Sequence, residues 1–129
     1  GRRFYDRIVC RDGVSLSVQA GEDVKSEPRT HAGPFQSVEI GFIEDENGNM
    51  LPSYALGMLA PYSDGSGEIW EHVPAHVVVD FIARHGGRAS GDCPPLASDI
   101  GEEYLIPSAA LPNPYPHRSY LECFEEEED

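Results

Sequence analysis

The feature that most constrains the fold is a tight turn between two short strands near the start of the chain. Residues 14–20 alternate apolar and polar side chains, the period-two pattern of a strand with one buried face. The strand before it can turn on residues 12–13 or on residues 11–13, and in the longer loop Gly13 takes the left-handed conformation that glycine tolerates. The two loops differ in register by one residue, which sends every side chain to the other face.

The hydrophobic pattern decides between the two loops. The three-residue loop pairs Ile8 with Leu16, apolar opposite apolar, whereas the two-residue loop pairs Cys10 with Ser15. We therefore predict the three-residue loop, with Cys10 in the core and Arg7 on the outer face with Ser15. Such a hairpin is a structural element and indicates no chemistry by itself.

Two apolar stretches follow the hairpin. Residues 35–43 alternate in the same way and predict a third strand, with Phe42 among the residues that face the core. Residues 50–62 are apolar but contain Pro52 and Pro61, and proline cannot donate a hydrogen bond within a central strand. We predict an irregular edge strand there.

A short strand and one helix come next. In residues 68–73 the alternation places Trp70 on the face opposite Val73. An aromatic residue there can mark a contact surface, but we expect Trp70 to be in the core or covered by the tail. Residues 74–85 predict a helix, because their first residue is a proline and the glycines at 86–87 supply a left-handed cap. The predicted apolar stripe of this helix consists of Val77, Val78, Phe81 and Ile82.

These elements predict an α+β fold with an antiparallel sheet of four or five strands and one packed helix, at about residues 74–85. We expect residues 1–87 to form this α+β domain. Residues 88–129 hold six of the 11 prolines and end in five consecutive acids, so we expect an extended acidic arm. No apolar run approaches the ~20 residues needed to cross a bilayer. The sequence predicts no signal peptide, although its first residue is Gly1 rather than methionine.

The charge of the chain is strongly negative and unevenly spread. Its 23 acidic and 9 basic residues give a net charge of −14, divided as +2 over residues 1–12, −7 over residues 13–89 and −9 over residues 90–129. Such a field repels phosphate backbones and disfavours direct binding to nucleic acid. It attracts a basic surface, including the nucleic-acid groove of another protein. The alternative is that the acidity only keeps the protein soluble.

Histidines and acids occur without the spacing that a metal site needs. His72 and His76 have the i, i+4 spacing of a zinc pair. Because the proline between them begins the helix, His72 lies outside it, and the spacing does not place the two imidazoles on one helix face. His85 lies in the last helical turn, where a cation interacts favourably with the helix dipole, and we expect it to act as a cap. A calcium loop that begins at Asp45 requires an acid at its twelfth position, which is Leu56.

The remaining candidates for chemistry are thiols, hydroxyls and paired acids. Ser15 and Ser17 have no base beside them in the sequence, no glycine-rich phosphate loop follows a strand, and a pair such as Glu102-Glu103 is usually solvated. The cysteines are too few and too scattered for a disulfide framework, so we expect free thiols in a reducing cytosol. They are Cys10, Cys93 and Cys123. We predict no catalytic residue, no metal ligand and no cofactor.

Residues 5–20, which read YDRIVCRDGVSLSVQA, resemble the opening of a group of small proteins encoded by tailed bacteriophages. The similarity continues through residues 33–42 and 73–87, so that it covers roughly residues 5–87. Members of this group often have a Tyr-Cys pair where this chain has Ser26-Glu27. The resemblance implies a phage protein but no activity and no site residue.

Three function hypotheses follow. The first is a non-enzymatic bacteriophage protein in the host cytoplasm that binds a basic host protein and inhibits a defence or nucleic-acid-handling machine. The second is a structural or accessory virion protein whose arm clamps a neighbouring subunit, and the third is a small metal-dependent hydrolase. The predicted partner-binding residues are the acids of the arm, Glu102, Glu103, Glu122, Glu125, Glu126, Glu127, Glu128 and Asp129.

Overall fold

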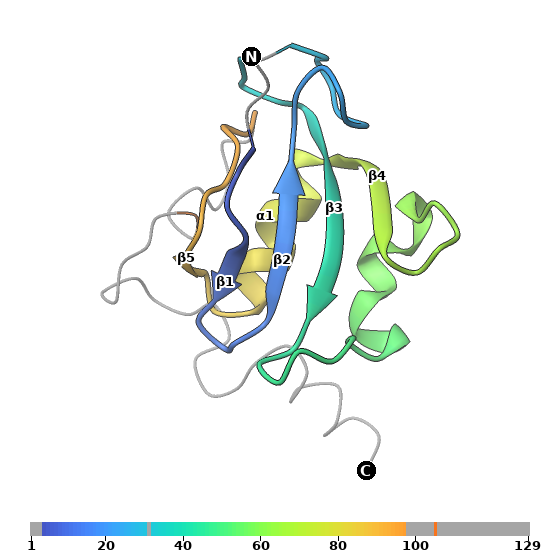
Figure 1. The fold of residues 1–129 in the computed structure, drawn as a ribbon, viewed down its shortest axis with the longest axis vertical. Coiled ribbons are helices and arrows are strands. Elements are labelled where there is room, and N and C mark those ends of the chain that lie inside the picture. Colours follow the sequence, from blue (N-terminus) through green and yellow to red (C-terminus); the bar gives the residue numbers. More distant parts are fainter. Residues whose placement is uncertain (1–3, 31, 98–104, 106–129) are drawn as a thin grey trace.

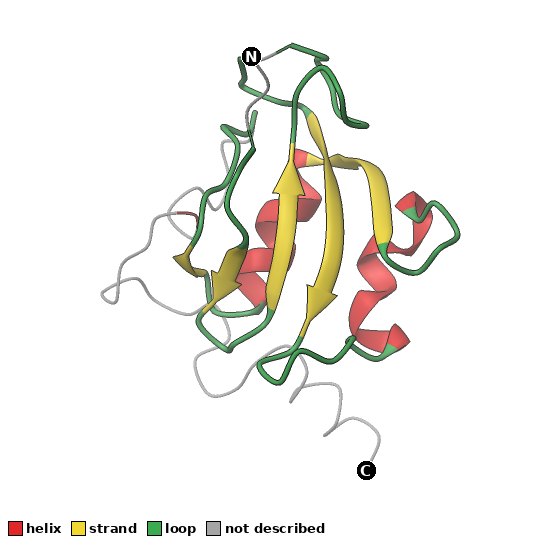
Figure 2. Cartoon of the chain, viewed as in Figure 1, coloured by secondary structure: helices red, strands yellow, loops and turns green. Residues whose placement is uncertain are grey.

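The computed structural model describes residues 4–30, 32–97 and 105. These residues form a five-stranded antiparallel sheet in the order β4-β3-β2-β1-β5, with helix α1 lying along one face (Figures 1 and 2). The elements are β1 (Ile8–Cys10), β2 (Ser15–Gln19), β3 (Ser37–Glu44), the 3₁₀ helix η1 (Ser53–Tyr62), β4 (Ile69–Pro74), α1 (Ala75–Arg84) and β5 (Arg88–Ser90). The predicted α+β fold is confirmed. Within the described residues, no helix is long and apolar enough to cross a membrane.

The turn between β1 and β2 has the predicted three-residue geometry. Ile8 lies opposite Leu16, and the Cys10 N–H donates to the Val14 carbonyl over 2.7 Å. Gly13 has a φ of +96°, the left-handed conformation that this loop requires. Cys10 is buried in the core, as its position in this register predicts.

Helix α1 packs its apolar side chains against the sheet. Val78, Phe81 and Ile82 are fully buried, and burying each contributes about 1.5–3 kcal/mol before conformational entropy. Val79 is also buried, whereas Val77 is only partly buried. The buried stripe is therefore rotated about the helix axis from the predicted one. The residues that face the sheet include those spaced i, i+3, i+4 and i+7 from the first helical residue.

The end of α1 is tied to the β1–β2 turn through His85. His85 is the C-cap residue of α1, as expected, but its side chain is fully buried. Its Nδ1 lies 2.7 Å from Oδ2 of Asp12, and Oδ1 of Asp12 accepts a hydrogen bond from the Val14 N–H. Two backbone hydrogen bonds run alongside, from the Arg11 N–H to the Gly87 carbonyl and from the Asp12 N–H to the His85 carbonyl. Hairpin and helix are thereby fixed to each other.

The stretch predicted as an irregular edge strand is the helix η1, so that prediction is wrong. Ala55 and Leu59 are buried, but Gly57 between them is exposed, whereas the alternation of a strand would bury every second residue. The Ala55 N–H donates to the Pro52 carbonyl over 3.0 Å. Pro52 precedes the helix, where its missing N–H is not needed. Helix η1 lies beside β4 at one edge of the sheet (Figure 1).

The sheet continues beyond the predicted domain boundary at residue 87. Strand β5 pairs with β1, with Val9 opposite Ser90, and Leu96 forms a parallel bridge with Phe35. The acids predicted to bind a partner fall within residues 98–104 and 106–129, which lie outside the described residues. A candidate site must therefore be sought on the described sheet and its connections.

Candidate functional site

Two β-bulges interrupt the strands on the β3–β4 side of the sheet. Ser17 lies opposite Gly41, but Ser15 lies opposite Glu44, so that β3 contains one extra residue between these pairs. The pairing of β3 with β4 shifts in the same way and places the second extra residue in β4, near His72 with its φ of +51°. A bulge re-aims the side chains next to it.

These bulges reverse two predicted side-chain orientations. Phe42, predicted to face the core, is 51% exposed, and the following residue, Ile43, is buried in its place. Trp70 is buried, as expected, but it lies in the same core as Val73 and not on the opposite face. Both face assignments are wrong for one reason, since an extra residue shifts the alternation of a strand by one position.

Phe42 holds an uncommon backbone conformation. Its φ is +52°, in the left-handed region that disfavours a residue with a Cβ atom by about 1–2 kcal/mol. Its N–H donates to the Glu68 carbonyl over 2.8 Å, and its own carbonyl accepts a hydrogen bond from the Arg7 guanidinium. Backbone strain that the surroundings hold in place is a reason to look for function at that residue.

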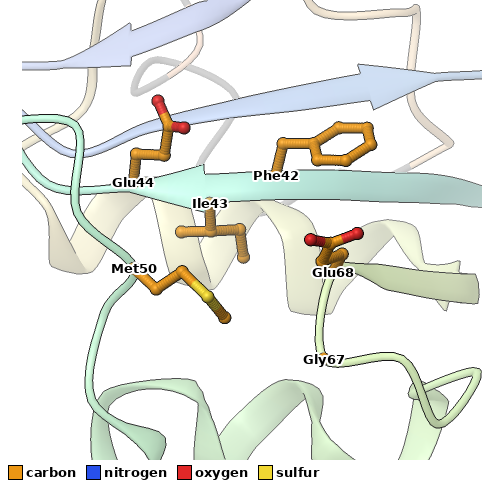
Figure 3. Close-up of a pocket in the computed structure, with 6 residues that line it drawn as sticks. All are labelled: Phe42, Ile43, Glu44, Met50, Gly67 and Glu68. Carbon is orange, nitrogen blue, oxygen red and sulfur yellow. The ribbon is translucent and has the colours of Figure 1, made fainter.

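A small pocket of about 70 Å³ lies beside Phe42, where the end of β3, the start of β4 and the chain before η1 meet (Figure 3). Its lining residues are Phe42, Ile43, Glu44, Met50, Gly67 and Glu68. Phe42 and Met50 are 51% and 62% exposed, and Ile43 is buried. Figure 3 shows Phe42 and Glu44 leaving β3 on one side and Ile43 on the other. The pocket thus combines apolar walls with carboxylates.

The two carboxylates of the pocket differ in their charge environment. An oxygen of Glu44 lies 3.4 Å from Nη2 of Arg7, whose Nε donates to Oγ of Ser15 over 2.9 Å. Arg7 therefore lies on the outer face with Ser15, as predicted, and partly neutralises Glu44. The exposed Glu68 carboxylate makes no ion pair or side-chain hydrogen bond with any other described residue. The negative charge that this pocket offers comes mainly from Glu68.

The pocket is smaller than the sites that hold drug-sized ligands or cofactors. Pockets for drug-sized ligands and cofactors have volumes of about 300–1,000 Å³, far above this one. Across the described part of the chain, no three His, Cys, Asp or Glu side chains gather in a way that could hold a metal ion. The hydrolase hypothesis therefore gains no ligand set from these residues.

The other groups singled out in the sequence do not join this pocket. His72 is an exposed residue of the β4 bulge and His76 an exposed residue of α1, so the helical spacing does not apply to them. Burial raises the pKa of the Cys10 thiol far above its ordinary range and raises the pKa of Cys93 to about 12. Both thiols are protonated at neutral pH, whereas the nucleophile of cysteine chemistry is the thiolate.

The sequence interpretation missed the pocket, although one signal for it was present. Phe42 and Ile43 are adjacent apolar residues at the end of an alternating stretch, and two such neighbours on one strand indicate a bulge. No local pattern places Glu68 or Met50 beside Phe42. That neighbourhood arises only from the pairing of β3 with β4 and from the turn after β3.

Comparisons of the chain with protein-family models, with curated proteins and with solved structures found no significant match. The resemblance of residues 5–87 to tailed-phage proteins therefore stays a prediction.

Proposed function

We propose that the protein is a non-enzymatic binding module that attaches to a basic surface of another protein. The observation that supports this proposal is the surface formed by Phe42, Glu44, Met50 and Glu68, which we call the bulge patch. Phe42 and Met50 are exposed, and two carboxylates, Glu44 and Glu68, line the same pocket.

The composition of the bulge patch is that of a protein-protein contact. Aromatic residues and methionine are enriched in interfaces, and a chain that holds a phenylalanine outward in a disfavoured conformation uses it for more than packing. The net charge of −14 steers a basic partner toward the molecule and repels an acidic one. The apolar residues then supply affinity and the acids supply orientation.

The biological setting that we propose is a bacteriophage protein acting in the host cytoplasm. Its partner is a host defence or nucleic-acid-handling protein, and its carboxylates occupy the basic surface that otherwise receives phosphates. The sequence resemblance of residues 5–20 supports the phage origin, and the acidity of the chain supports the class of partner.

The test is affinity purification of the tagged full chain from infected host cells, followed by calorimetry with the purified partner at low and high ionic strength. We expect binding that weakens steeply with salt and weakens further with Phe42→Gly or Glu68→Gln. The matched control is Asp6→Asn, which removes one exposed charge outside the bulge patch. Affinity that is unchanged by salt, or a partner without a basic surface, contradicts the proposal.

Analysis of purified virions separates this proposal from the second hypothesis, that of a structural or accessory virion protein. A protein present at many copies in the particle, bound through apolar contacts that resist salt, is an accessory virion component. In that case the acidic surface serves solubility and not recognition.

A further inference from the structure

We infer that the bulge patch binds one arginine side chain of the partner. This inference rests on the proposed function and deepens it, because it names the group that the pocket receives. It follows from three features of the described residues: an exposed aromatic ring, an uncompensated carboxylate and a guanidinium already bound nearby.

The first feature is the ring of Phe42. It is 51% exposed, and the hydrogen bonds of its N–H to Glu68 and of its carbonyl to Arg7 fix the backbone that carries it. A planar guanidinium stacks on an exposed aromatic face more readily than an ammonium group does. Met50, 62% exposed, lines the same pocket from the Ile43 side of β3 (Figure 3) and adds an apolar wall there.

The second feature is the carboxylate of Glu68. Within the described residues it has no cation beside it, although it lies at a pocket whose other carboxylate, Glu44, is paired with Arg7. A long basic side chain with an apolar stem is the protein group that satisfies both the apolar walls and this charge. The pocket volume of about 70 Å³ admits the end of one side chain and excludes a bulky ligand.

The third feature is that this edge of β3 already accommodates a guanidinium. Arg7 donates to the Phe42 carbonyl and lies 3.4 Å from a Glu44 oxygen, so the bulge places a carbonyl and a carboxylate where the forked donors of one arginine reach both. The partner's arginine meets Glu68 in the same manner from the pocket side. Arg7 acts as a positioning residue for the bulge.

The inference is tested by NMR titration of the isotope-labelled full chain with N-acetyl-arginine-N-methylamide. We expect saturable shifts of the Phe42, Met50 and Gly67 amide signals. The citrulline analogue, which has nearly the same shape and no charge, should bind several-fold more weakly. Glu68→Gln should weaken the arginine probe by about two- to fivefold, the range of one exposed ion pair.

Two variants control this titration. Asp6→Asn also removes one negative charge but does not line the pocket, and it should leave the dissociation constant of the arginine probe unchanged. Phe42→Gly should abolish saturation while the remaining amide signals keep their dispersion, which shows that the fold is intact. Equal binding of the two probes, or equal weakening by Glu68→Gln and Asp6→Asn, overturns the inference.

The outcome is separable from that of the proposed function. If the probe fails while the partner still binds in a salt-sensitive manner, the arginine subsite is rejected and the proposed function stands. If the probe binds at the pocket but the purified partner binds without salt dependence, the subsite stands and the proposed mode of partner recognition is rejected.

Discussion

Substitution of Phe42 by glycine and by alanine separates the strain of its backbone from the contribution of its ring. In an ordinary strand, glycine is less stable than alanine by about 0.5–1 kcal/mol, because glycine loses more conformational freedom on folding. At Phe42 the φ of +52° reverses this preference, since only glycine adopts that conformation without the Cβ clash. We expect Phe42→Gly to be more stable than Phe42→Ala.

The magnitude follows from the exposure and the dihedral angle. The ring is 51% exposed, so its burial contributes roughly half of the full value for a phenylalanine, or about 1 kcal/mol. Alanine loses this contribution and keeps the strain, which lowers the free energy of unfolding by about 1 kcal/mol. Phe42→Gly also loses the contribution of the ring. It is relieved of about 1–2 kcal/mol of backbone strain, and its greater loss of conformational entropy costs about 0.5–1 kcal/mol. Phe42→Gly should therefore lie close to the wild type and about 0.5–1 kcal/mol above Phe42→Ala.

Urea unfolding followed by tryptophan fluorescence measures this difference. The chain has a single tryptophan, Trp70, which is buried and reports on the core. The reference position is Val9, which is 37% exposed on β1 and has no positive φ. There alanine should be more stable than glycine. If alanine is as stable as glycine at Phe42, the left-handed strain is absent and the reasoning about the bulge is refuted.

Three further predictions address the fold. Gly91→Ala should destabilise the protein far more than Gly48→Ala. Both glycines have a positive φ (+90° and +82°), but only at Gly91 would a Cβ lie 2.0 Å from the Arg7 carbonyl oxygen. Equal urea midpoints of the two variants contradict this. Phe81→Asp should unfold the domain, since removing a buried phenylalanine alone costs about 3–5 kcal/mol and the buried charge adds to it; an unchanged melting temperature removes α1 from the core. Burial raises the pKa of Cys93 from 9.0 to about 12, so the stability this thiol contributes is complete below pH 9.0 and falls as pH rises toward 12. Urea titrations above and below pH 9.0 check this against Cys93→Ala, and a constant difference between the two proteins contradicts it.

The hairpin shows where sequence reasoning succeeds. Its register was predictable because the turn and the alternation act over a few residues and exclude the competing pairing of Cys10 with Ser15. The α1 helix was predictable for the same reason, from its closing glycines and from Pro74, which lies one residue before the helix and not at its first position as predicted. These signals lie within the segments that they specify.

Errors occurred where a second strand or another segment decided the outcome. The stretch that forms η1 contains the prolines that suggested an edge strand, but in the structure it is helical and packs Ala55 and Leu59 into the core. Phe42 and Trp70 were assigned to the wrong faces because bulges are set by the pairing of two strands. The buried His85 likewise meets Asp12, a partner that is distant in the sequence.

We could predict from the sequence alone the α+β class, the hairpin register, the position of α1 and the negative charge, because each is a sum or a pattern of neighbouring residues. The outward orientation of Phe42 and its meeting with Met50 and Glu68 at one pocket follow from the fold, because they come from long-range pairing. A bulge adds a single residue to one strand, a change that leaves the local composition intact and yet inverts the orientation of every side chain beyond it.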